Sequence, residues 1–183
     1  MRRAWPLALV GALVCSLSAC GPSLDDYTIT EVKVVEDLPK SERRLRNNGG
    51  YLRIDLASEF DLTADTNGNI YAYASRCPFD DDAEVLAIGP LAGSEPPVDL
   101  YDVGEAMPRD DAGLAHYVVY IPVADLYGSA LGSQSTDKSA DAVASEEDDL
   151  CLKIRQQGYY LTSSQSGTIR IPVNQWQAAL ADR

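Results

Sequence analysis

The chain has 183 residues and a formal net charge of -13, from 15 basic and 28 acidic side chains. This acidity argues against a nucleic-acid binder, which needs basic patches to face the phosphate backbone. A single histidine excludes a histidine-rich metal site, and a hydrophobic content of 45% excludes wholesale disorder. The length suits one globular domain with short appendages.

The N-terminus has the composition of a secretion signal. Arg2 and Arg3 precede residues 4–14, which are mostly leucine, alanine and valine. This apolar run is too short to cross a bilayer, and it matches the hydrophobic region of a signal peptide. The sequence Leu17-Ser18-Ala19-Cys20 follows it after two further residues.

These four residues resemble the lipobox of bacterial lipoproteins, and the resemblance covers about the first 21 residues. It implies cleavage of residues 1–19, diacylglycerol on the Cys20 thiol and acylation of the new amino group. Two or more acyl chains give stable membrane anchoring. In that family an aspartate after the cysteine tends to retain the protein in the inner membrane. Gly21 stands there, so the resemblance implies an outer-membrane protein that faces the periplasm; a plain secretory leader with a chance cysteine is the alternative.

Cysteine usage predicts one disulfide. After processing and lipidation of Cys20, only Cys77 and Cys151 remain as free thiols. In an oxidising compartment these two are expected to pair, which would stabilise the domain by about 4 kcal/mol on the loop-entropy model. Two separate thiols are the alternative, and two cysteines without histidine neighbours do not complete a metal site.

Beyond a tether at residues 20–26, residues 27–183 read as a single β-rich domain. Alternating and β-branched runs, bounded by turn residues, predict its strands. The expected strands cover 28–35, 51–56, 70–77, 84–88, 98–103, 114–123 and 150–155, followed by a hairpin of 159–162 and 168–173 around a turn at 163–167. Asn174 is expected to cap a short C-terminal helix.

The strand pattern predicts the fold class. Leu52, Ile54 and Leu56 share one face of their strand, whereas residues 117–121 are apolar on both faces and should lie centrally. A flexible acidic insertion is expected at about 128–149. Short strands with turns between them and little helix predict an antiparallel β-sandwich or small barrel of about eight strands.

A candidate cation site comprises Asp61, Asp65, Asn67 and Asn69. Oxygen-bearing side chains alternate here as in a calcium loop, but no glycine or acid stands where an EF-hand requires them. Asn67-Gly68 between two strands is a strong hairpin signal, which favours a turn. The prediction is a weak cation site at best, with no tightly bound metal and no cofactor.

Two acidic runs flank the two cysteines. Residues 80–82 follow Cys77, and residues 146–149 precede Cys151. A disulfide would bring both runs together, and the combined negative potential would attract a basic protein partner. Simple solubility is the alternative explanation.

No catalytic motif accompanies His116, which alternates with Val118 and Tyr120 on a strand. The chain has no second histidine, no nucleophile elbow, no phosphate loop and no dinucleotide fingerprint. We therefore expect a protein that is not an enzyme, but a lipid-anchored envelope lipoprotein that acts as a binding, accessory or structural module. The alternative is an immunity-type lipoprotein that blocks a basic toxin or hydrolase.

Overall fold

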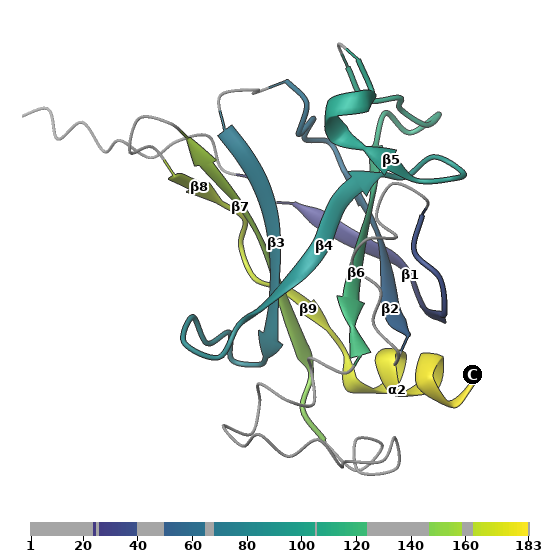
Figure 1. The fold of residues 1–183 in the computed structure, drawn as a ribbon, viewed down its shortest axis with the longest axis vertical. Coiled ribbons are helices and arrows are strands. Elements are labelled where there is room, and N and C mark those ends of the chain that lie inside the picture. Colours follow the sequence, from purple (N-terminus) through teal and green to yellow (C-terminus); the bar gives the residue numbers. More distant parts are fainter. Residues whose placement is uncertain are drawn as a thin grey trace, which may run out of the picture.

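The computed structural model describes residues 24, 26–39, 50–64, 68–104, 106–123, 147–158 and 163–182. This part of the chain is mainly β (Figure 1). The strands are β1 (Tyr27–Val35), β2 (Tyr51–Ser58), β3 (Gly68–Arg76), β4 (Val85–Ala92), β5 (Val98–Asp99), β6 (Ala115–Pro122), β7 (Leu150–Gly158), β8 (Ser163–Gln165) and β9 (Ile169–Ile171). A 3-10 turn, η2 (Leu100–Asp102), follows β5, and the helix α2 (Val173–Ala181) follows β9.

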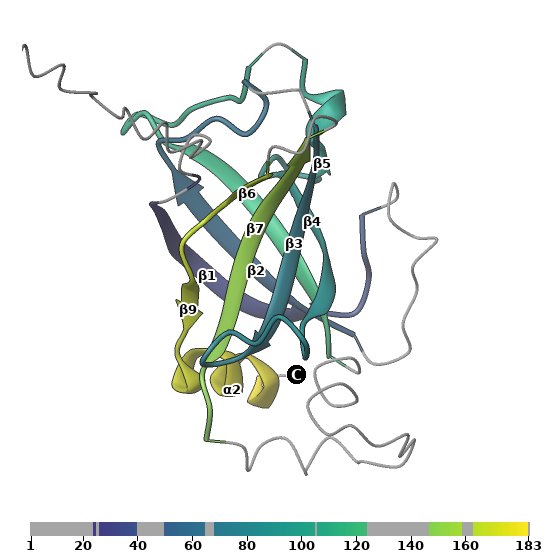
Figure 2. The ribbon, with the colours of Figure 1, turned by 90° about the vertical axis from the view of Figure 1, so that its left-hand side faces the viewer.

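All nine strands belong to one antiparallel sheet that is not closed. The strand order is β1-β2-β6-β4-β3-β7-β8, with β5 paired to β4 and β9 paired to β7. The sheet curves so that β1, β2 and β6 lie behind β3 and β7, with α2 at one end (Figure 2). The predicted mainly β, antiparallel fold with a short C-terminal helix is confirmed.

Strand β4 joins the two halves of this curved sheet. Its first part pairs with β3, from Val85 to Ala87, and its second part pairs with β6, from Ile88 to Ala92. A register shift between Ile88 and Leu91 marks the change of partner. The predicted end of this strand at residue 88 was wrong, because the bulge at Gly89 and Pro90 bends the strand without terminating it.

The core lies between the two halves and follows the predicted alternation. Leu52, Ile54 and Leu56 of β2 are all buried, and they pack with inward residues of β6 and β7. Trp176 of α2 closes one end of this core. Leu24 is only 1% exposed, so the folded part of the chain already begins before β1.

A second apolar cluster covers the outer face of β2, β6 and β4. Tyr51, Val118 and Tyr120 are buried there beneath Leu38, which belongs to the segment after β1. This cluster explains why residues 117–121 are apolar on both faces, and it confirms their predicted central position.

The C-terminal region differs from the prediction. Part of the predicted turn at 163–167 forms strand β8, which pairs with β7, as β9 does. The first predicted hairpin strand, 159–162, lies outside the described residues. The helix begins after Pro172 with no side-chain cap of its own, so Asn174 does not cap it. The predicted strand 98–103 is a two-residue strand followed by η2.

Candidate functional site

The predicted disulfide is present and pins the end of β3 to the start of β7. Cys77 and Cys151 are bonded with an S–S distance of 2.03 Å and a Cα–Cα distance of 5.2 Å. The backbone N–H of Cys77 also donates to the carbonyl oxygen of Asp149 at 2.9 Å. A structural disulfide indicates an oxidising, extracytoplasmic location for the domain.

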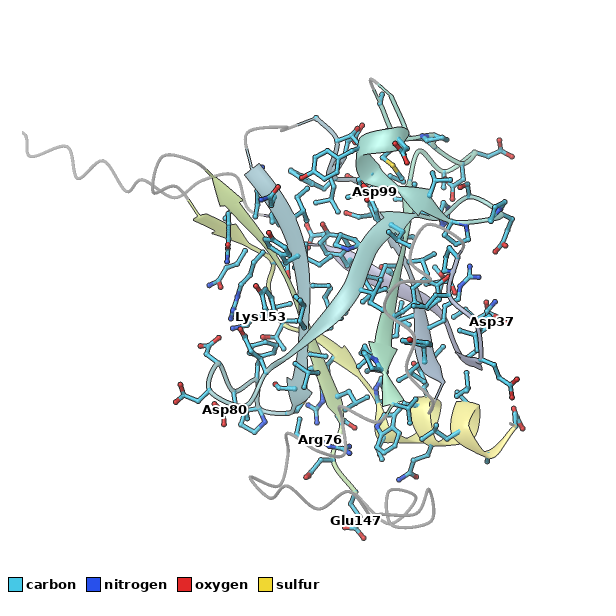
Figure 3. All side chains as sticks on the ribbon, viewed as in Figure 1. Asp37, Arg76, Asp80, Asp99, Glu147 and Lys153 are labelled. Carbon is cyan, nitrogen blue, oxygen red and sulfur yellow. A yellow bond between two sulfur atoms is a disulfide. The ribbon has the colours of Figure 1, made fainter. Side chains whose placement is uncertain are left out.

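The two acidic runs lie at the same end of the molecule as the disulfide. Figure 3 shows Asp80 and Glu147 at this end, with Arg76 between them. The runs are partly neutralised, because Asp81 pairs with Arg155 and Asp149 pairs with Arg170. Within the described part of the two runs, Asp80, Asp82, Glu147 and Asp148 are exposed and form no ion pair.

The loop after Cys77 folds back over two cations of β7. Lys153 Nζ lies 4.4 Å from the centre of the Phe79 ring, and the Arg155 guanidinium lies 5.5 Å from it. Glu84 Oε1 accepts a hydrogen bond from Arg155 Nη1 at 2.9 Å. Both cations are therefore largely shielded, and they hold the loop against the sheet through cation–π and ionic contacts.

A row of half-buried and exposed side chains follows the outer face of β3. Since Ala72 and Ala74 face the core, Tyr71 and Tyr73 face outward, with ring centroids 6.4 Å apart. Leu86 of β4 stands directly opposite Tyr73 in the register and is 56% exposed. Lys153 of β7, labelled in Figure 3, stands opposite Tyr73 in the register and therefore faces the same side of the sheet.

The row continues beyond the start of β3. The hydroxyl of Tyr101, which is 64% exposed on η2, donates to Asn69 Oδ1 at 3.3 Å. Asp99 positions this turn by accepting from the Tyr101 backbone N–H at 3.0 Å. We call Asn69, Tyr71, Tyr73, Leu86 and Tyr101 the tyrosine stripe. Sequence reasoning missed it, although the alternation of Tyr71 and Tyr73 on one strand was a usable signal.

His116 is half-buried on β6 and pairs with an acid. Its Nε2 lies 2.8 Å from Asp110 Oδ2. The backbone N–H of Leu114 and the His116 ring lower the pKa of Asp110, so this carboxyl stays ionised and orients the imidazole. The pair lies at a pocket of about 460 Å³ that includes Val98, Met107 and Ser94.

This pocket does not assemble a serine triad. The Ser94 hydroxyl donates to the carbonyl oxygen of Pro96 at 2.7 Å, which directs it away from proton transfer to His116. The Arg109 guanidinium donates to two backbone carbonyls, those of Glu59 at 3.0 Å and Gly113 at 2.6 Å. The polar groups here brace the loops around the pocket.

The candidate cation site is only partly described. Asp61 uses both carboxylate oxygens internally, accepting from the Thr63 hydroxyl at 2.6 Å and from the Met107 backbone N–H at 3.2 Å. Burial opposes its ionisation, but these hydrogen bonds lower the pKa of Asp61. Asn69 instead belongs to the tyrosine stripe, and Asp65 and Asn67 lie outside the described residues. Among the described residues, no three histidine, cysteine or acidic side chains gather as metal ligands.

Cys20, the predicted lipidation site, lies outside the described residues, as does most of the predicted insertion at 128–149. None of the helices in the described ranges has the length and apolar content to cross a membrane. Comparison with family models, curated proteins and solved structures found no match to the chain.

Proposed function

We propose that the protein is a lipid-anchored envelope lipoprotein whose β domain acts by binding. The lipobox carries this proposal, because Leu17-Ser18-Ala19-Cys20 follows a short apolar run with a basic start. The Cys77–Cys151 disulfide supports it, since the disulfide requires an oxidising compartment of the kind to which such a leader delivers a protein.

Binding is the activity that the described surface supports best. Leu86 and Tyr101 are exposed, and tyrosines with exposed apolar side chains are typical of contact surfaces. The His116–Asp110 pair has a serine nearby whose hydroxyl is engaged by Pro96, which argues for a structural role of this pair.

Cell fractionation tests the anchoring. Full-length protein should partition with the outer membrane and take up labelled palmitate. Cys20→Ser should abolish both, because the thioether cannot form. Cys15→Ser is the matched control, since it changes a cysteine of the same leader and leaves the lipobox intact. Retention of Cys20→Ser in the membrane after a high-salt wash would refute the anchor.

A second candidate function is inhibition of a basic protein. The observation that favours it is the position of Asp80 and Glu147 at the end of the molecule that carries the disulfide (Figure 3); Asp82 and Asp148 belong to the same two acidic runs. When the protein is used as bait on envelope extracts, it should then capture a basic protein. Salt at 0.5 M, roughly three times the physiological concentration, should release that protein by screening the charges. Unchanged capture after all four acids are converted to amides would eliminate this candidate.

A further inference from the structure

We propose that the tyrosine stripe binds an uncharged polysaccharide chain. The inference rests on the proposed function in one respect: the envelope location would give the protein access to such a polysaccharide. The stripe places Asn69, Tyr71 and Tyr73 along one face of β3. Leu86 of β4 stands opposite Tyr73, and Tyr101 of η2 is hydrogen-bonded to Asn69. Sugar rings present an apolar C–H face that stacks on aromatic rings, and hydroxyl edges that hydrogen-bond amides.

The rings are held in place before any ligand arrives. The Arg155 guanidinium lies 4.9 Å from the Tyr73 ring centre, and Arg155 is itself fixed by Asp81 and Glu84. The Arg155 guanidinium thus covers one face of the Tyr73 ring and holds the ring in position. Tyr71 stands beside it on the same rigid strand, and a platform built on a paired strand loses little conformational entropy on binding.

The charge of the stripe selects the class of ligand. Arg155 and Lys153 are the cations beside it, and both are compensated by Asp81, at 4.0 Å from Lys153. Asn69 and Gln157, paired across β3 and β7, are exposed amides without charge. A polyanion would be repelled by a chain of net charge -13. A polycation would bind to the exposed acids near the disulfide and not to the stripe. The stripe itself complements a neutral, hydroxyl-rich chain.

Calorimetric titration of the full-length protein, purified in mild detergent, tests the proposal. The probes are the neutral hexasaccharides of β-linked N-acetylglucosamine and of β-linked glucose, with a carboxylate-bearing hyaluronan hexasaccharide as the charged comparison. At least one neutral probe should bind, and hyaluronan should bind more weakly. Binding in this assay does not depend on the lipid. Absence of polysaccharide binding is therefore distinguishable from absence of the membrane anchor.

Three variants locate the binding. Tyr71→Ala and Tyr101→Ala should each weaken binding of the neutral probe about tenfold, because each removes one stacking ring. Tyr71→Phe keeps the ring and should bind within about twofold of the parent. Tyr101 is exposed on a short turn, so its substitution leaves the fold intact even where Tyr71→Ala disturbs β3.

Three results would overturn the proposal. The first is absence of binding of both neutral probes at millimolar concentration. The second is unchanged affinity in Tyr101→Ala. The third is an envelope protein that co-purifies with the parent but not with Tyr101→Ala, when neither neutral probe binds. That result would show that the stripe binds a protein partner instead of a polysaccharide.

Discussion

Asp149 caps a helix that begins 24 residues later: its Oδ1 accepts a hydrogen bond from the backbone N–H of Val173 at 2.7 Å. Its other oxygen pairs with Arg170, and the neighbouring carbonyl of Asp148 accepts from the Trp176 indole at 3.3 Å. The residues just before β7 therefore supply the cap that α2 lacks locally. The Val173 N–H and the Arg170 guanidinium lower the pKa of Asp149.

Asp149→Ala should lower the stability of the protein near neutral pH. In acid, the difference in stability between the parent and this variant should disappear. A carboxyl whose pKa is lowered by folding contributes stability above its unfolded pKa of about 3.9, and that stability is lost as the pH falls through the folded pKa. At pH 7 the Tm should fall by a few degrees, and Asp149→Asn should lose less because the amide oxygen still accepts the Val173 bond. A difference in Tm that grows on acidification would contradict this role.

Removal of the disulfide should lower the stability substantially. Cys77→Ser with Cys151→Ser should reduce the free energy of unfolding by about 2–5 kcal/mol, because the unfolded chain gains the freedom that a long cross-linked loop denies it. Urea unfolding measures the change, and non-reducing mass spectrometry of the parent should show one cross-linked peptide pair. Two alkylatable thiols in the native parent would refute the bond.

Gly89→Ala tests the bend in β4. Gly89 has a φ of +106°, and a Cβ there would lie 2.7 Å from the carbonyl oxygen of Val118. We expect a loss of about 2–4 kcal/mol, from strain and from the disturbed pairing with β6. Gly113→Ala is the matched control: its φ is +81° but its Cβ would meet nothing within 4 Å, so the loss should be only about 1 kcal/mol. Equal losses would show that the contact with Val118 is unimportant.

Tyr117→Phe should destabilise the protein by about 1–3 kcal/mol. The buried hydroxyl donates to Phe60 O at 2.7 Å and accepts from Leu62 N–H at 2.9 Å, which ties the loop after β2 to β6. Burial raises the pKa of Tyr117 to about 12.

The ionisation of Tyr117 gives an independent readout. Stability from a raised pKa is complete below the unfolded value of about 10 and is lost as the pH rises toward 12, so the gap in Tm between parent and variant should close in that window. Ultraviolet difference absorption should show one late-titrating tyrosine that Tyr117→Phe removes. A parent in which every tyrosine titrates near pH 10 would contradict the buried position.

Local pattern accounts for much of the fold. Alternation in β2 identified its core face, because side chains of successive strand residues point to opposite sides. The pairing of Cys77 with Cys151 followed from counting the thiols that the proposed processing would leave. His116 alternates with Val118 and Tyr120 on β6, as the sequence pattern indicated, and its side chain is half-buried.

The remaining features depend on residues that are distant in the sequence. Gly89 and Pro90 resemble a strand end until Val118 of β6 is placed beside them. The cap of α2 comes from Asp149, and the stripe exists because η2 brings Tyr101 to Asn69 of β3. Periodicity within one segment carries no information on such contacts.

The modification at Cys20 tests the central claim most directly, by mass spectrometry of the N-terminal peptide of the protein extracted from membranes. The proposed lipoprotein should begin at Cys20 and carry the mass of a diacylglycerol on the thiol and an acyl chain on the amino group. A mature chain that begins at another residue, or one that begins at Cys20 with an unmodified thiol, would contradict the proposed lipid anchor.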